Sequence, residues 1–432
     1  MSLKSVKVGI CGLGTVGSGT FNVLTRNAQE ISRRVGCDII VEQIGARRDH
    51  PNCITTGTNI TRDIFDVAIN PDVDVVVELI GGSDTALKLV MLAIENGKHV
   101  VTANKALIAV HGNEIFAAAK KHNVTVAFES AVAGGIPIIK ALREGLAANK
   151  IDSVAGIING TGNFILSEMQ EKARDFESVL AEAQALGYAE ADPTFDVEGI
   201  DAAHKLTILA SIAYGVPLQF SKAYTQGISK VTIEDVKFAE QLGYTIKHLG
   251  IARRVEEGIE LRVHPTLIPK HTLLANVNGV MNAVLVDADA VGQTLHYGAG
   301  AGDEATASAV IADIIDIARN INSTTPAVAP LGFQSEELSA TPILAMEKTE
   351  TSYYLHMKAA EKPGVLAQVT KILGDCDINI EAIVQKETDQ DCVPVILLTQ
   401  KVVEKKMNTA IEAIEALDNI LGDVTMIRVE LL

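Results

Sequence analysis

The sequence predicts an α/β protein that begins with a Rossmann-type nucleotide-binding domain and ends with a smaller βαββαβ domain. Strand-like and helix-like segments alternate from Val6 to Phe128, as they do in a parallel sheet covered by helices. The glycine-rich segment Gly12–Gly17 directly follows the first strand-like segment. A second alternating pattern, in the order βαββαβ, begins at Tyr353. The region between the two patterns mixes helices and strands, so we expect an α+β domain there.

The first region consists of short strands separated by helices. Its segments Val73–Leu79 and His99–Thr102 are rich in β-branched residues and are bounded by turn residues, as expected for strands covered on both faces. The expected order is strand Val6–Cys11, a helix from about Val16 to Arg34, strand Ile39–Ala46, a helix near Asp63–Ile69, strand Val73–Leu79, helix Asp84–Asn96, strand His99–Thr102, a helix after Asn113, and strand Val124–Phe128.

The second region extends from about Ala131 to Ala301. Its segment Gly199–Tyr214 has high helix propensity and is apolar nearly all round, which is typical of a helix buried inside a domain. A further helix is expected at Ala305–Asn320, after a cluster of glycines. Prolines then recur among Ser and Thr, so this stretch is expected to be a linker.

The last region is expected to form a separate small domain. Its elements are strand Tyr353–Ala359, helix Val365–Cys376, strands Ile378–Lys386 and Pro394–Thr399, helix Glu404–Ala416 and strand Val424–Val429. The expected organisation is therefore a nucleotide-binding domain at 1–130 with a returning helix at 302–320, a second domain at 131–301, a linker at 321–350 and a C-terminal domain at 351–432.

Composition restricts the classes of function. At 432 residues the chain is long enough for two or three domains. Its formal net charge of −17 argues against nucleic acid or an anionic membrane as a partner, because both attract positive charge. The five cysteines lack metal-ligand spacing, so we expect a reduced, cytoplasmic protein. No apolar run approaches the ~18 residues of a membrane span.

The expected chemistry lies at Asp201 and Lys205, on the helix that is otherwise apolar. Residues four apart lie on one face of a helix, so Asp201 can hold the ammonium group of Lys205 while that group points into a cavity. A purely structural ion pair is the alternative. The buried setting of the helix and the carboxylates immediately upstream, Glu190, Asp192 and Asp196, favour the functional interpretation.

The segment Gly12-Leu-Gly14-Thr-Val-Gly17 follows a strand and begins a helix, the context of a dinucleotide-binding turn. Gly12 permits the tight turn, Gly14 lets the main chain approach the pyrophosphate, and Gly17 lets the helix pack on the strand. The N–H groups at the start of the helix then face the phosphates. A glycine-rich turn without a ligand is the alternative.

The second strand ends at Arg47-Arg48. An arginine at this place can accept the 2′-phosphate of NADP, whereas an acidic residue would bind the 2′-hydroxyl of NAD. We therefore expect NADP, with NAD possible. Two exposed arginines without a functional role are the alternative.

Together these segments resemble the homoserine dehydrogenase family, in its monofunctional form with a C-terminal ACT domain, since no aspartokinase region precedes Met1. The resemblance covers essentially the whole chain. It is carried by Gly12–Gly17, Thr102-Ala-Asn-Lys105, Glu129-Ser-Ala-Val-Ala-Gly-Gly-Ile-Pro137, Asn159-Gly-Thr-Gly-Asn163, Gly187–Lys205 and Gly298–Gly302. The family reaction is the reversible reduction of aspartate 4-semialdehyde to homoserine, in threonine, methionine and isoleucine biosynthesis.

The resemblance implies a role for each matching residue. Lys205 would give the proton to the carbonyl oxygen, and a dry cavity and Asp201 would adjust its pKa. The substrate would be bound by Gly160, Thr161, Tyr188, Glu190, Asp196, Asp201 and Lys105. The cofactor would be bound by Gly12, Leu13, Gly14, Thr15, Val16, Gly17, Arg47, Arg48, Lys105, Gly187 and Gly302. A monovalent cation, usually sodium, would be bound by Glu129, Val132, Gly134 and Ile136, largely through main-chain carbonyls.

The tail resembles an ACT domain, with Glu361–Leu366 as the loop before its first helix and Ile378–Gln385 as the next strand. The resemblance implies threonine as a feedback effector; a structural, dimerising tail is the alternative. The family's loop often carries Asp where this chain has Glu361. The family expectation is a dimer through the second, catalytic domain, and pairing of ACT domains would make a tetramer.

Two other functions would also fit parts of the sequence. Aspartate-semialdehyde dehydrogenase needs a cysteine nucleophile, and the sequence has none between Cys53 and Cys376. A non-catalytic amino-acid sensor would keep the ACT domain on a degenerate dehydrogenase body. The glycines, Lys105, Asp201 and Lys205 are all present, which argues against a degenerate body.

Overall fold

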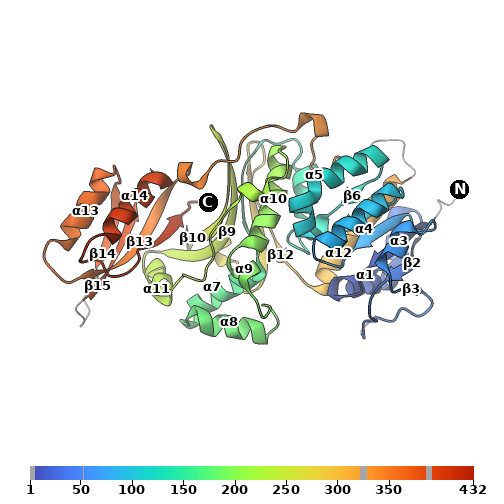
Figure 1. Cartoon of the computed structure of the whole chain (residues 1–432), viewed down its shortest axis with the longest axis horizontal. Coiled ribbons are helices and arrows are strands. Elements are labelled where there is room, and N and C mark those ends of the chain that lie inside the picture. Colours follow the sequence, from blue (N-terminus) through green and yellow to red (C-terminus); the bar gives the residue numbers. More distant parts are fainter. Residues whose placement is uncertain (1–4, 52, 322–327, 386–391) are drawn as a thin grey trace.

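The computed structural model describes residues 5–51, 53–321, 328–385 and 392–432. Three regions follow one another along its longest axis, from the nucleotide-binding region through the central sheet to the C-terminal region (Figure 1). The first region holds a six-stranded parallel sheet in the order β3-β2-β1-β4-β5-β6. This order confirms the predicted Rossmann-type sheet.

The strands of this sheet are β1 (Val6–Cys11), β2 (Ile39–Gly45), β3 (Asn59–Thr61), β4 (Val75–Glu78), β5 (His99–Thr102) and β6 (Val126–Ala127). Its helices are α1 (Thr15–Arg26), α2 (Ala28–Val35), α3 (Ile64–Ile69), α4 (Asp84–Glu95) and α5 (Lys105–His122). Strand β3 was not expected from the sequence. It is only three residues long, and its residues are exposed or half-buried, so they leave little apolar pattern.

Two helix predictions in this region were wrong. The helix expected from about Val16 to Arg34 is broken at Asn27, whose dihedral angles (φ −102°, ψ 14°) leave the helical region and separate α1 from α2. The helix expected after Asn113 begins earlier, at Lys105, because the side chain of Asn104 accepts a hydrogen bond from the N–H of Leu107 (3.1 Å) and caps the helix there.

Helix α12 (Asp303–Asn320) returns to the first region after the central one. It packs beside α1, and its apolar residues Val310 and Ile314 join the same core as Val8 and Ile10 of β1. Gly19 makes this contact possible, because a Cβ at that position would lie 2.7 Å from the main-chain oxygen of Asp303.

The central region is a largely antiparallel sheet that carries the buried helix α10 (Ile200–Tyr214) on one face. Left-handed glycines bound this helix on both sides, Gly199 (φ 82°) and Gly215 (φ 63°). The strands are β7 (Ile151–Ile157), β8 (Tyr224–Thr225), β9 (Tyr244–Val255), β10 (Gly258–Pro269), β11 (Met281–Ala288) and β12 (Gly292–Ala299). The other helices are α6 (Ile138–Lys140), α7 (Gly160–Lys172), α8 (Phe176–Ala185), α9 (Thr194–Val197) and α11 (Ile233–Gln241).

The C-terminal region has the expected order of elements, with one additional two-residue strand. They are β13 (Glu350–Ala360), α13 (Val365–Asp375), β14 (Ile380–Gln385), β15 (Cys392–Thr399), β16 (Val402–Val403), α14 (Glu404–Glu415) and β17 (Thr425–Val429). Lys386, at the end of one expected strand, and residues 322–327 of the expected linker lie outside the described residues.

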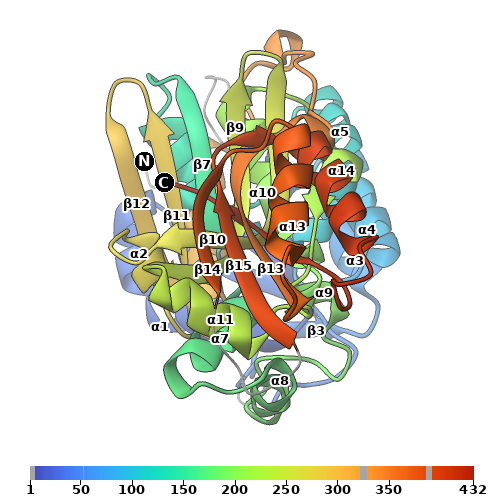
Figure 2. The same ribbon diagram turned by 90° about the vertical axis from the view of Figure 1, so that its left-hand side faces the viewer.

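The C-terminal strands continue the central sheet. Strand β17 pairs in parallel with β10 through Thr266 opposite Arg428 and Leu267 opposite Val429. The result is one eleven-stranded sheet that spans both regions, in the order β12-β11-β7-β9-β10-β17-β13-β15-β14 with β8 and β16 at its sides. Figure 2 shows the C-terminal strands lying against β10. None of the described helices is long and apolar enough to span a membrane.

Candidate active site

The turn between β1 and α1 has the geometry of a phosphate-binding turn. Gly12 has φ 101°, and a Cβ there would lie 2.5 Å from the main-chain oxygen of Leu79. A Cβ on Gly17 would lie 2.0 Å from the main-chain oxygen of Gly12, so only glycine lets α1 pack against the turn. A Cβ on Gly14 would meet nothing within 4 Å, so the space beside this residue is open.

This turn borders a cavity of about 850 Å³ at the carboxyl ends of the parallel strands. Arg47 and Arg48 are exposed and line it, together with a third arginine, Arg62. Arg62 donates to the main-chain oxygen of Ala46 (3.0 Å) and to Asp49 (2.9 Å). Arg62 was not predicted from the sequence, because it follows strand β3, which was itself not expected.

Not every predicted cofactor residue lines this cavity. Its lining includes Gly12, Leu13 and Gly14 with the arginines. Thr15, Val16 and Gly17 belong to the first turn of α1, behind the glycine turn. Gly187 lies in an exposed loop before α9, and Gly302 (φ 139°) precedes the first residue of α12.

Glu78, at the end of β4, organises the loops at the far side of the cavity. Its buried carboxylate accepts hydrogen bonds from the N–H groups of Ile80 (2.9 Å) and Gly81 (3.3 Å), and from the hydroxyl of Thr102 (2.6 Å). Burial raises the pKa of this carboxyl group against those hydrogen bonds. The hydroxyl of Thr102 also accepts from the N–H of Asn104 (3.0 Å), just before Lys105.

The structure brings Lys205, Lys105 and Asp201 together where the first two regions meet. The ammonium group of Lys205 lies 2.7 Å from one carboxylate oxygen of Asp201 and donates to the main-chain oxygen of Ile158 (2.7 Å). The ammonium group of Lys105 lies 3.1 Å from the other carboxylate oxygen. Lys105 begins α5 and Asp201 lies in the first turn of α10, so the cluster joins two domains.

Asn159 connects this cluster to a second carboxylate. It caps α7 by accepting from the N–H of Gly162 (2.7 Å), and its side-chain amide donates to Asp201 (2.9 Å) and to Asp196 (2.8 Å). Asn159 belongs to one of the segments that carry the family resemblance, but no role was predicted for it. Asn at the start of a helix was the available signal.

The charges of the cluster decide which groups are ionised. Burial disfavours the charged form of Asp201, but the ammonium groups of Lys205 and Lys105 outweigh burial and lower its pKa. Asp201 is therefore a carboxylate at neutral pH. Burial also acts on Asp196, and there it prevails and raises the pKa.

The remaining predicted substrate residues surround the cluster unequally. Gly160 starts α7, and the hydroxyl of Thr161 donates to the main-chain oxygen of Tyr188 (2.6 Å). Tyr188 is 44% exposed, so its ring can face a ligand. Glu190 is exposed. Among the described residues, the hydrogen bonds to the carboxylate of Asp201 come from Asn159 and Lys205.

Three rings that the sequence analysis did not single out lie beside the cluster. The ring of His204 lies 4.1 Å from that of Phe220 and 5.5 Å from that of Phe195. The ammonium group of Lys105 lies 5.5 Å from the centre of the Phe195 ring. Burial lowers the pKa of His204 to about 4 despite the nearby carboxylate of Asp201, so this imidazole is neutral at pH 7.

Comparison with known proteins gives this arrangement a family. The family models described as "Homoserine dehydrogenase, NAD binding domain", "Homoserine dehydrogenase" and "ACT domain" match residues 12–129, 137–315 and 353–419. A homoserine dehydrogenase from Pseudomonas aeruginosa is 67% identical over 431 residues, which cover 99% of both chains. The chain belongs to the homoserine dehydrogenase family.

Solved structures agree with this assignment. The crystal structure of a homoserine dehydrogenase from Thiobacillus denitrificans is 60% identical, covers 99% of both chains and has a TM-score of 0.95. A hyperthermophilic archaeal homoserine dehydrogenase solved in complex with NADPH is 26% identical, with a TM-score of 0.62 over 75% of this chain and all of the other. The chain is therefore an oxidoreductase with a nicotinamide-nucleotide domain and an ACT domain.

The loop expected to bind a cation in this homoserine dehydrogenase is buried. Val132 and Ile136 are at most 2% exposed, and a Cβ on Gly134 (φ 38°) would lie 2.6 Å from the main-chain oxygen of Gly300. The Glu129 carboxylate accepts from the N–H groups of Ile139 and Lys140 (2.9 Å each). Burial, with Asp313 nearby, raises the pKa of Glu129 to about 7.

The ligands that this loop can offer are main-chain oxygens and the Glu129 carboxylate, whose two oxygens each accept from an N–H group; oxygen ligands are the type that a hard cation of low charge takes. Among the described residues, no group of three or more His, Cys, Asp or Glu side chains could hold a metal ion. Any cation at the loop would therefore be held mainly by the main chain.

The cysteines agree with the exclusion of an acylating dehydrogenase. Cys11, Cys37 and Cys53 are buried in the first region, while Cys376 and Cys392 belong to the ACT domain. Burial, and then the carboxylate of Glu78, raises the pKa of the Cys11 thiol. A thiol held in its neutral form is a poor nucleophile.

Proposed function

We propose that Lys205 is the proton donor of this homoserine dehydrogenase and that Asp201 and Lys105 orient the substrate against it. One observation carries the proposal: two ammonium groups from different domains share a single buried carboxylate, at 2.7 Å and 3.1 Å. A surface ion pair would not need a second cation. A site that must bind an aldehyde oxygen and exchange a proton with it needs a second cation.

The reaction requires one hydride and one proton. NADPH, when bound, supplies the hydride to the carbonyl carbon of L-aspartate 4-semialdehyde. Lys205 gives a proton from its ammonium group to the carbonyl oxygen, which becomes the hydroxyl of L-homoserine, and takes it back in the reverse direction. The carboxylate of Asp201 and the main-chain oxygen of Ile158 both accept from this ammonium group and fix its position.

The substrate is an amino acid, so its α-ammonium group needs negative charge nearby. We propose that Asp196 and Glu190 supply it, with Gly160, Thr161 and Tyr188 forming the adjoining wall. Asp196 is linked to Asp201 through Asn159. Glu190 is exposed and must turn inward to take part.

The cofactor is proposed to be NADP, with NAD as the poorer alternative. Arg47, Arg48 and Arg62 line the cavity beside the glycine turn and offer charge-assisted hydrogen bonds to a 2′-phosphate. The archaeal relative in complex with NADPH supports the same choice. Replacing Arg47 and Arg48 with Ala should raise the KM for NADPH more than that for NADH. An equal rise for both would give the arginines another role.

We further propose sodium at the loop of Glu129, Val132, Gly134 and Ile136. Activity should then be higher in sodium chloride than in choline chloride at equal ionic strength. Equal activity in the two salts would reject a required cation.

For the ACT domain we propose L-threonine as the effector, and for the assembly a homodimer through the central sheet or a homotetramer through ACT pairing. We propose the cytoplasm as the compartment, because the five cysteines of the sequence are scattered without metal-ligand spacing. Sedimentation analysis decides between dimer and tetramer, and a monomer would overturn both.

The deciding experiment is NADP⁺ reduction with L-homoserine, followed at the nicotinamide absorbance with and without L-threonine. We expect activity that threonine suppresses. Activity that does not respond to threonine would remove the effector and keep the dehydrogenase. An absence of activity with either cofactor would overturn the proposed site.

A further inference from the structure

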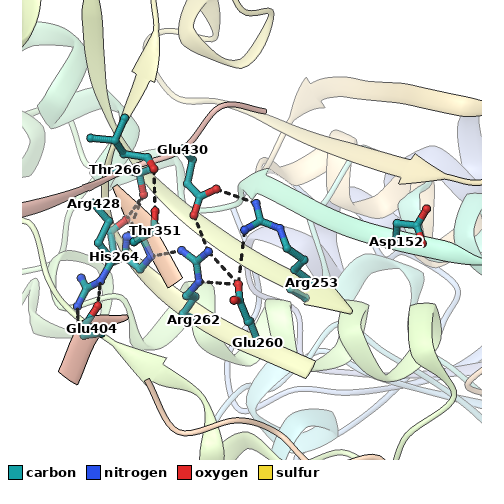
Figure 3. Close-up of polar contacts among 12 residues, drawn as sticks. Asp152, Arg253, Glu260, Arg262, His264, Thr266, Thr351, Glu404, Arg428 and Glu430 are labelled. Carbon is teal, nitrogen blue, oxygen red and sulfur yellow. Dashed lines mark hydrogen bonds and ion pairs between the residues drawn. The ribbon is translucent and has the colours of Figure 1, made fainter. Parts of the chain in front are cut away.

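A buried network of charges lies where the ACT domain joins the central sheet (Figure 3). Arg262 of β10 is fully buried and donates to Glu260 of the same strand (3.0 Å) and to Glu430, just after β17 (2.5 Å). Arg253 of β9 donates to Glu430 as well (2.7 Å). Charges without water around them need good geometry to be tolerated, so this network holds β17 in one position on β10.

Arg428 of β17 extends the contact toward the central region. Within the ACT domain it donates to Glu404 (2.8 Å), the first residue of α14. Outside the ACT domain it donates to the side-chain oxygen of Gln226 (2.6 Å) and to the hydroxyl of Tyr224 (3.2 Å). Gln226 therefore receives a charged hydrogen bond from the regulatory domain.

The main chain of Gln226 continues the connection to His248 of β9. The Nε2 atom of His248 donates to the main-chain oxygen of Gln226 (3.0 Å), because a carbonyl can only accept. His248 is 5% exposed, and burial lowers its pKa to about 4.

The ring of His248 lies against two glycines. A Cβ on Gly199 would lie 3.1 Å from its Cε1 atom and 3.2 Å from its Nε2 atom. A Cβ on Gly162 would lie 3.5 Å from its Nδ1 atom. The ring thus fills the space beside the starts of two helices, α10 and α7.

The first turns of both helices position residues of the proposed catalytic cluster. Gly199 is the cap of α10, which carries Asp201 and Lys205. Gly162 belongs to the first turn of α7, whose cap Asn159 donates to Asp201 (2.9 Å). A shift of the His248 ring would change the position of one helix start against the other, and with it the geometry of the carboxylate.

We propose that His248 is a positioning residue for Asp201 and Lys205, and that Gln226 connects it to the ACT strand β17. The chain of contacts runs from Arg428 through Gln226 and His248 to the two helix starts. It gives the regulatory domain a direct mechanical route to the proton donor. The inference rests on the catalytic role proposed for Lys205.

The test begins with His248→Phe, which keeps a ring and removes the donor. We expect kcat for homoserine oxidation to fall about 10-fold, since small misplacements of catalytic groups have such effects. The KM for NADP⁺ should stay within about 2-fold, because His248 is not among the residues that line the nucleotide cavity. His248→Gln, which can still donate to the carbonyl, should recover most of the loss.

Gln226→Leu removes the side-chain hydrogen bond that Gln226 accepts from Arg428 of the ACT domain. Gln226 is half-buried, so this variant should fold even if His248→Phe does not. We expect its kcat to fall about 3-fold and its inhibition by L-threonine to weaken. The double variant Gln226→Leu/His248→Phe should have a kcat close to that of His248→Phe alone, since residues in one route are not additive.

The matched control is His356→Phe. His356 is a buried histidine of the ACT domain that bonds to Asp235 of α11 (2.7 Å), a second contact between the same domains. Its kcat should stay within about 2-fold of the native value. An equal loss in this control would show that docking in general, and not the proposed route, supports turnover.

The remaining outcomes are also decisive. A folded His248→Phe enzyme with native kcat, or a folded Gln226→Leu enzyme with native kcat and threonine response, would overturn the inference. Lys205→Ala is measured in the same series. If Lys205→Ala retains turnover, the proposed catalytic role fails; if it loses turnover while His248→Phe does not, only the positioning role fails.

Discussion

Asp201 is charged in a buried position because two ammonium groups face it. Burial works against ionisation, and the attraction of Lys205 and Lys105 outweighs it. Removal of one ammonium group would leave the carboxylate paired with a single cation. The two lysines differ in exposure. The side chain of Lys205 is 12% exposed and therefore enclosed, whereas that of Lys105 is 35% exposed and open to ligands.

Lys205→Ala should lower kcat by about 10²–10⁴-fold, the usual contribution of general acid catalysis. The variant should fold, because Lys105 still neutralises Asp201. Steady-state kinetics and a thermal melt measure the two effects. Lys140→Ala, at an ion pair with Asp316 outside the cluster, is a control for the loss of a lysine charge. Near-native turnover in Lys205→Ala would reject the assignment.

His204 should make stability depend on pH. Its pKa is lowered from 6.5 to about 4, so between these values the unfolded chain binds a proton that the folded chain does not. For this group alone, stability therefore rises as pH increases from about 4 to about 6.5. His204→Gln should reduce the rise of the melting temperature with pH in that window. An unchanged slope would mean that the imidazole is already protonated when folded.

Two glycines at the start of helix α1 differ in what requires them, although they belong to the same motif. Gly17 is required by packing, because its Cβ would collide with the main-chain oxygen of Gly12 at 2.0 Å. Gly14 has open space beside it and an ordinary extended conformation (φ −80°, ψ −160°). The fold itself does not require glycine at position 14, so we propose that the close approach of the ligand does.

Gly14→Ala should therefore fold normally and bind NADPH poorly, with a KM raised about 10-fold or more. Gly17→Ala should lose at least about 1–3 kcal/mol of stability, because the added methyl group must displace α1. A thermal melt and a cofactor titration of both variants give the comparison. A destabilised Gly14→Ala, or a native-like Gly17→Ala, would contradict this division of roles.

At the scale of the molecule, the ACT domain is a continuation of the catalytic sheet. Strand β17 lies between β10 and β13, and it brings Glu430 into contact with Arg262 and Arg253. Breaking a buried ion pair by removing one partner costs about 3–5 kcal/mol. The tail is therefore part of the fold of the central region.

A chain that ends at Thr349 should be poorly soluble or strongly destabilised. It would expose the edge of β10 and leave Arg262 buried with Glu260 but without Glu430. Soluble yield and melting temperature measure the effect. The full-length variant Lys362→Ala, in the exposed loop before α13, should melt like the native chain. A stable, soluble truncated chain would show that the sheet does not depend on β17.

The predictions from the sequence depended on local patterns, and this explains which of them were confirmed. The strand Val6–Cys11 and the start of the glycine turn were visible because short-range spacing determines them. The predicted start of helix α5 was too late in the sequence, because a single capping residue, Asn104, decides where the helix begins. Asn159 was included in a motif without a role, since its partners are 37 and 42 residues away in the sequence.

By itself the sequence determined the family, the Rossmann-type region, the buried helix α10 and the pairing of Asp201 with Lys205, because each follows from residues close together in the chain. Only the tertiary structure decided that Lys105 reaches the same carboxylate, that Arg62 joins the cofactor cavity and that β17 completes the catalytic sheet. These contacts join segments that are far apart in sequence, and their energy comes from burial and charge pairing that exist only once the chain has folded.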